Sequence, residues 1–65
     1  MTMKLIKSKY GIEVKEDTTT GRLFMYLDGL CIFTDGIPKD YARMVERSFN
    51  ELAEIRKKTH GEQKQ

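Results

Sequence analysis

Few residues in this sequence could carry out chemistry, and their spacing does not bring them together. Cys31 is the one cysteine and His60 the one histidine, so a nucleophile has no imidazole partner that a folded core would hold. These two residues are also too few for a zinc site, and no acidic run has the spacing of a calcium loop. The glycines form no phosphate-binding motif. We therefore expect no enzyme activity, no catalytic residue, no metal and no cofactor.

Basic side chains offer a second kind of chemistry, the binding of phosphate groups. Lys39, Arg43 and Arg47 recur every four residues and would form one row along a helix. The same row is also typical of solubilising charges, because several glutamates lie on the same segment. Twelve Lys and Arg against ten Asp and Glu give a net charge of only +2, which does not by itself indicate nucleic-acid binding. This row therefore carries our alternative interpretation.

The length of 65 residues limits the size of the core. A chain of this length buries only about 60% of the surface that its unfolded form exposes, and small domains usually add a disulfide, a metal or a second subunit. Cys31 has no second cysteine to pair with, which favours an unreactive thiol in a reducing compartment. No apolar run approaches the roughly 20 residues that span a bilayer, and the first residues lack the apolar core of a secretory signal. We expect a soluble, cytoplasmic protein with no membrane partner.

Alternating apolar residues predict an antiparallel sheet. Ile12 and Val14 alternate with charged residues, as in a half-buried strand that begins near Lys4. The polar run 17–21 ends in glycine and predicts a hairpin loop, and Asp28-Gly29 is typical of a two-residue type I′ turn. We predict three strands: one that begins near residue 4 and is followed by the loop 17–21, a second at residues 22–27 and a third at residues 30–34.

One amphipathic helix is expected after the sheet. Pro38 suits its first turn, and Asp40 complements the positive end of the helix dipole there. Apolar residues spaced by three and four form a stripe that we assign to the core, namely Tyr41, Met44, Val45, Phe49, Leu52, Ala53 and Ile55. The predicted fold is α+β, a three-stranded antiparallel sheet of two hairpins packed on one C-terminal helix (βββα). Residues 1–58 would form this single domain, and 59–65 a flexible polar tail.

The register of the sheet decides which apolar residues the helix covers. If residues 17–21 form the first loop, the helix covers Tyr10, Ile12, Val14, Phe24, Tyr26, Cys31 and Phe33. The opposite face then exposes five aliphatic side chains, namely Leu23, Met25, Leu27, Leu30 and Ile32. One helix cannot cover both faces, so we expect this patch to bind a protein partner or a second copy in a homodimer. Two alternatives stay open: a chain end covers the patch, or a one-residue slip in the first loop reverses the facing.

The order of these segments resembles that of a known family. The run 12–17, a glycine-ended turn, the run 23–36 and a helix are similar to the N-terminal domain of HicB-type antitoxins, over roughly residues 10–55. The positions that match the family's short GC-x-T-x-G strand are Cys31, Thr34 and Gly36. Members of that family usually carry an additional strand and often a separate DNA-binding segment, and the proline-containing stretch before the short strand is missing here. The resemblance implies a module that blocks or regulates a partner protein.

We therefore predict a small non-enzymatic interaction protein, a bacterial or phage regulator or inhibitor that docks on a protein partner through the exposed sheet face, with a homodimer as one form of this docking. The alternative is a nucleic-acid-binding βββα module for transcription or recombination. A second resemblance, to integrase arm-binding domains that read DNA with a three-stranded sheet, is the family-level argument for that alternative.

Overall fold

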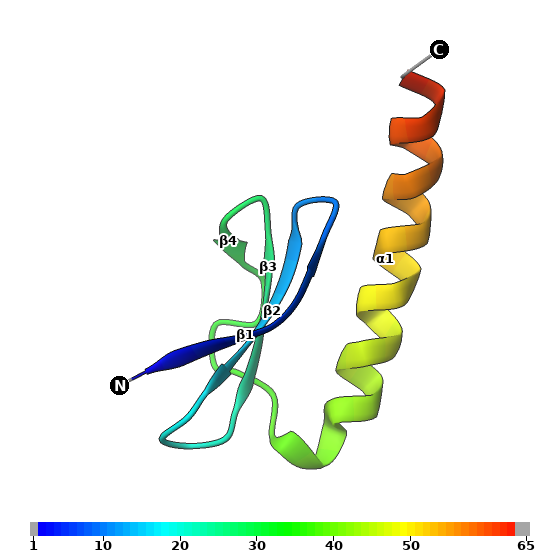
Figure 1. Cartoon of the computed structure of the whole chain (residues 1–65). Coiled ribbons are helices and arrows are strands. Elements are labelled where there is room, and N and C mark those ends of the chain that lie inside the picture. Colours follow the sequence, from blue (N-terminus) through cyan, green and yellow to red (C-terminus); the bar gives the residue numbers. More distant parts are fainter. Residues whose placement is uncertain (1, 64–65) are drawn as a thin grey trace.

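A four-stranded antiparallel sheet carries one long helix on one of its faces (Figure 1). The computed structural model describes residues 2–63, with side chains described for residues 2–59. Four strands follow one another across the sheet in chain order, namely β1 (Met3–Lys9), β2 (Ile12–Asp17), β3 (Leu23–Leu27) and β4 (Leu30–Cys31). A 3-10 turn at Lys39–Tyr41 leads into the helix α1 (Ala42–Gln63). The predicted α+β class, with one helix after the sheet, is confirmed.

The prediction of three strands is wrong, because the first predicted strand is a hairpin. Tyr10 and Gly11 have φ angles of 54° and 81°, and Lys9 pairs with Ile12 across this two-residue turn. Positive φ is uncommon for tyrosine, so a turn at this position could not readily be predicted from the residue types. The segment before Tyr10 therefore folds back as β1, which pairs with β2 and forms one edge of the sheet.

The second predicted turn, at Asp28-Gly29, is confirmed. The two residues have φ angles of 52° and 89°, and Leu27 pairs with Leu30 across them. β4 ends at Cys31, although we predicted a strand to residue 34. The chain then bends, and Ile37 returns to pair with Leu23 in an isolated bridge. The segment after β4 therefore lies along the edge of β3.

The loop between β2 and β3 is one residue shorter than predicted. Asp17 belongs to β2, and its carboxylate accepts hydrogen bonds from the backbone N–H groups of Thr19 (2.8 Å) and Thr20 (3.4 Å). Its own N–H donates to the carbonyl of Arg22 at 2.8 Å, which closes a four-residue loop. Val14 consequently pairs with Met25, where the longer loop would have paired it with Phe24. A slip of one residue turns each side chain of β3 to the other face.

The core lies between α1 and the central strands β2 and β3. Its buried apolar side chains are Ile12, Val14, Leu23, Met25, Val45, Phe49 and Ala53. Ile12 and Val14 face the helix as predicted. The assignment of Phe24, Tyr26 and Cys31 to the helix-covered face is wrong, because the shorter loop places them on the opposite face.

The helix is longer than predicted and extends past the sheet (Figure 1). It continues to Gln63, although the expected tail began at residue 59. The Thr59 hydroxyl donates to the Ile55 carbonyl one turn earlier, at 3.2 Å. The last two residues of the predicted tail, 64 and 65, lie outside the described part of the chain. Within that part, α1 is too polar to cross a membrane.

Candidate protein-interaction surface

The aliphatic patch that we predicted does not exist on the uncovered face of the sheet. Leu23 and Met25 are 7% and 0% exposed, and Leu27 packs against the same core beneath α1. The prediction is wrong for these three because the shorter loop after Asp17 turns β3 over. Leu30 and Ile32 are exposed, at 73% and 40%. Two of the five predicted interface residues are therefore available to a partner.

The uncovered face of the sheet is a mixture of aromatic and charged groups. The Lys15 amine lies 4.9 Å from the centre of the Tyr26 ring and 3.8 Å from the Glu13 carboxylate. Phe24 is half-buried beneath the turn that contains Gly36, where an added Cβ would lie 2.8 Å from the ring. On this face, neighbouring groups of the same chain therefore cover part of the aromatic rings, and the face also carries charge.

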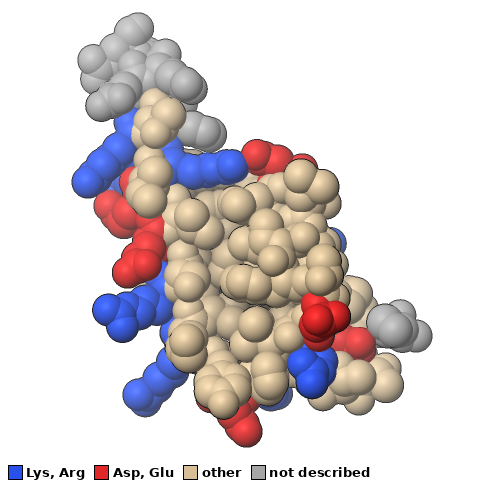
Figure 2. All heavy atoms as spheres, turned by 180° about the vertical axis from the view of Figure 1, so that it is seen from behind, with Lys and Arg blue, Asp and Glu red and all other residues tan. Residues whose placement is uncertain are grey.

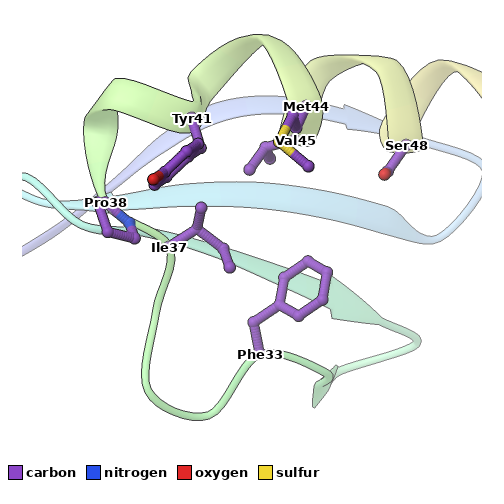
Figure 3. Close-up of a pocket in the computed structure, with 7 residues that line it drawn as sticks. All are labelled: Phe33, Ile37, Pro38, Tyr41, Met44, Val45 and Ser48. Atoms are coloured by element: carbon purple, nitrogen blue, oxygen red, sulfur yellow. The ribbon is translucent and has the colours of Figure 1, made fainter.

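An apolar groove lies elsewhere, between the start of α1 and the segment that follows β4 (Figure 3). Its volume is about 410 Å³. It is lined by Phe33, Ile37, Pro38, Tyr41, Met44, Val45 and Ser48, which we call the apolar groove. The helix supplies the side chains of one wall and the segment after β4 those of the other. The hydroxyls of Ser48 and Tyr41 are the two polar side-chain groups in this lining.

The groove wall formed by the segment after β4 is held in place by specific contacts. The backbone groups of Ile37 and Leu23 exchange two hydrogen bonds of 2.8 Å. The Arg22 guanidinium donates to the carbonyls of Asp35 and Gly36, at 3.4 and 3.2 Å. Gly36 has a φ of 78° and is buried against Phe24, so a side chain could not be accommodated there. The groove is thus part of the folded scaffold.

The helix contributes an exposed apolar stripe to this side of the molecule. Tyr41, Met44 and Ile55 are 53%, 64% and 61% exposed, so their predicted assignment to the core is wrong. At 100° per residue the apolar positions of α1 cover an arc of roughly 180°, which is wider than one sheet face covers. Residues on the groove side of this arc are called the flank stripe, namely Tyr41, Met44, Ser48 and Ile55. The width of the arc was the sequence signal that could have identified them.

The side of the molecule that carries the apolar groove has charged side chains at its border and none at its centre. Figure 2 shows a broad surface without Lys, Arg, Asp or Glu, with charged groups along the outer rim of the helix and at the margins. No lining residue of the apolar groove is charged. Such an arrangement, with an apolar centre and a charged border, is typical of protein interfaces.

The predicted phosphate-binding row does not form a free basic surface. The Lys39 amine lies 3.2 Å from the Glu16 carboxylate, and Arg47 lies 3.8 Å from Glu51. Arg43 is exposed and lines a hollow between the start of α1 and β1. Two of the three cations therefore already face a carboxylate, which a phosphate group would have to displace.

Arg56 has a structural role that the sequence did not reveal. Its guanidinium donates two hydrogen bonds to the Asp28 carboxylate and one to the Tyr10 carbonyl, so α1 is joined to both two-residue turns. The pKa of Arg56 is raised above its usual value, mainly by the hydrogen bond to Asp28. Desolvation opposes this increase, and the negative charge of Asp28 adds to it.

The described residues offer no grouping for metal chemistry. Among them, no three His, Cys, Asp or Glu side chains come together as metal ligands would. Cys31 is a free, half-buried thiol whose Sγ donates to the Phe33 carbonyl at 3.4 Å. The side chain of His60 lies outside the described part.

Comparison of the chain with protein-family models, with curated proteins and with solved structures finds no match.

Proposed function

We propose that this chain is a small non-enzymatic interaction protein that binds a second protein chain, of its own or another kind, through the apolar groove. The observation that carries the proposal is the exposure of Tyr41 and Met44, each more than half exposed, at the mouth of a groove lined almost entirely by apolar side chains. Fully burying one large apolar side chain stabilises a complex by about 1.5–3 kcal/mol. Covering the flank stripe would therefore favour association.

The shape of the surface favours a protein over a small molecule. From Tyr41 to Ile55 the flank stripe is about 21 Å long, at 1.5 Å per helical residue. An amphipathic helix is well matched to such a surface, because its apolar residues recur at three- and four-residue spacings along one side. Leu30 on β4 and Ile32 just after it add exposed apolar area. A small ligand would leave most of this surface uncovered.

In this proposal the chain acts as a regulator or inhibitor of its partner, as the resemblance to HicB-type antitoxins implies. A free cysteine fits a reducing compartment, so we place this function in the cytoplasm. Nucleic-acid binding receives no support from Lys39 and Arg47, since both already face carboxylates. We keep it as an outcome of the experiment.

The proposal can be tested with a photo-crosslinking amino acid placed at Met44 in cells that produce the full chain. We expect a discrete protein adduct that survives nuclease treatment and is lost when Tyr41→Glu is added. The matched control carries the same amino acid at Asn50, which is exposed and lies away from the groove on the helix. Adducts of equal yield from positions 44 and 50, or adducts that nuclease removes, would contradict the proposal.

A further inference from the structure

We propose that the protein bound in the apolar groove is a second copy of this chain, with the two α1 helices packed antiparallel about a two-fold axis beside Ser48. This inference rests on the proposed function, because it names the occupant of the same groove. It follows from the order of large, small and charged side chains along the flank stripe.

The sizes of the side chains are self-complementary in this arrangement. Two antiparallel helices related by an axis beside Ser48 place Tyr41 of each copy near Ile55 of the other. The small Ser48 side chains meet at the axis, where they allow close approach. Met44, which is 64% exposed, then lies near Leu52 of the second copy, which is half-buried against its own core. Each large exposed group of the stripe thus gains an apolar neighbour.

The charges beside the stripe are complementary in the same register. A two-fold axis perpendicular to the helices brings the outer flank of one helix against the same flank of the other. Arg47 then faces Glu51 of the second copy, and Asp40 faces Lys58. Within one chain, Arg47 and Glu51 are 3.8 Å apart and strongly exposed, and no ion pair joins Asp40 or Lys58 to any described residue. A parallel packing of the helices forms neither intermolecular pair.

The form of the single chain also favours a second copy. The buried apolar core of the described part consists of seven side chains, one of which is alanine. Domains of this size usually add a further source of stability, and no disulfide is possible with one cysteine. The helix extends past the sheet, and Ile55 near this overhang is 61% exposed. Helix pairing would cover this end of α1 as well as the groove.

The first experiment tests the position of the axis. In a Cys31→Ser background, Ser48→Cys places one thiol in each copy next to the axis. Helices that pack about 8–10 Å apart bring facing Cα atoms to about 5 Å, which a disulfide spans. We expect a disulfide-linked dimer under mild oxidation, and little from the matched Asn50→Cys variant on the outer side of α1. Equal crosslinking of the two variants would overturn the proposal.

The second experiment tests the register by exchanging charges, with self-association measured by sedimentation equilibrium. Asp40→Lys should weaken the dimer about tenfold, and adding Lys58→Asp should restore most of the affinity. The matched control is Asn50→Lys, which adds the same charge away from the stripe and should change the affinity little. Failure of the second substitution to restore the affinity would overturn the proposed register.

The two proposals can fail separately. A native chain that stays monomeric up to millimolar concentration, while its Met44 crosslink contains a different protein, would overturn the second copy and leave the proposed function in place. Absence of both self-association and any groove-specific crosslink would overturn both. A Met44 crosslink between two copies of the chain, lost with Tyr41→Glu, would support both.

Discussion

Arg56 on the helix and Asp28 in the second hairpin turn are joined by two hydrogen bonds of 2.8 Å, and the same guanidinium donates to the Tyr10 carbonyl of the first turn at 2.9 Å. One side chain thus connects α1 to both turns at one end of the sheet. The planar fork of arginine allows these contacts, whereas a lysine amine cannot pair with both carboxylate oxygens in the same way.

Arg56→Lys should therefore lower the melting temperature by a few degrees, as measured by circular dichroism. The matched control is Arg47→Lys, where the ion pair with Glu51 is longer and both side chains are strongly exposed, so little change is expected. The pKa of Arg56 in the folded chain is raised above an already high value. Its contribution to the free energy of unfolding should therefore stay constant across neutral and moderately alkaline pH. Equal effects of the two substitutions would contradict this role of Arg56.

The two turn glycines should respond differently to alanine. Gly11 and Gly29 both have positive φ, which costs alanine about 1–2 kcal/mol. An added Cβ at Gly29 meets open space, but at Gly11 it would lie 2.6 Å from Asp28 Oδ1 and 2.8 Å from Arg56 Nη1. Urea unfolding should show that Gly11→Ala is the more destabilising change. The difference in destabilisation between Gly11→Ala and Gly29→Ala should shrink in an Arg56→Ala background. The contact between Arg56 and Asp28 that Gly11→Ala disturbs is already absent there.

Substitutions in β3 and β4 test the register of the sheet. Met25 is 0% exposed, so Met25→Ala should lower the free energy of unfolding by about 2–5 kcal/mol. Leu30 is 73% exposed, and Leu30→Ala should change it by less than about 0.5 kcal/mol in the monomer. Urea unfolding at low protein concentration compares the two. An effect of Met25→Ala as small as that of Leu30→Ala would mean that Met25 is not buried beneath α1 and that β3 faces the other way.

The sequence predicted the parts of the fold that depend on short-range signals. The Asp28-Gly29 turn, the facing of Ile12 and Val14 and the helix after Pro38 all follow from turn chemistry or from the alternation of side chains. The facing of β3 could not be predicted in this way, because residues 23–27 are apolar at every position and show no alternation. A hydrogen bond from Thr19 to the Asp17 side chain closes the shorter loop, and this contact depends on the folded turn.

The candidate surface was missed for a related reason. The groove brings Phe33 and Ile37 against Met44 and Val45, and this contact depends on the bend after β4. The apolar positions of α1 were visible in the sequence, but not which of them the sheet would leave uncovered. The sequence suggested a buried Met44 and an exposed Met25, and the structure shows the opposite.

The most direct test of the buried Met25 and the exposed Met44 is the oxidation of methionines by dilute hydrogen peroxide, followed by mass spectrometry. Cleavage after Lys39 and Arg43 separates Met25 from Met44. In the dilute native chain we predict rapid oxidation of Met44 and slow oxidation of Met25, with Met44 becoming protected as the protein concentration rises. Faster oxidation of Met25 than of Met44 would contradict the register of the sheet, and a Met44 rate that is independent of concentration would contradict the second copy in the groove.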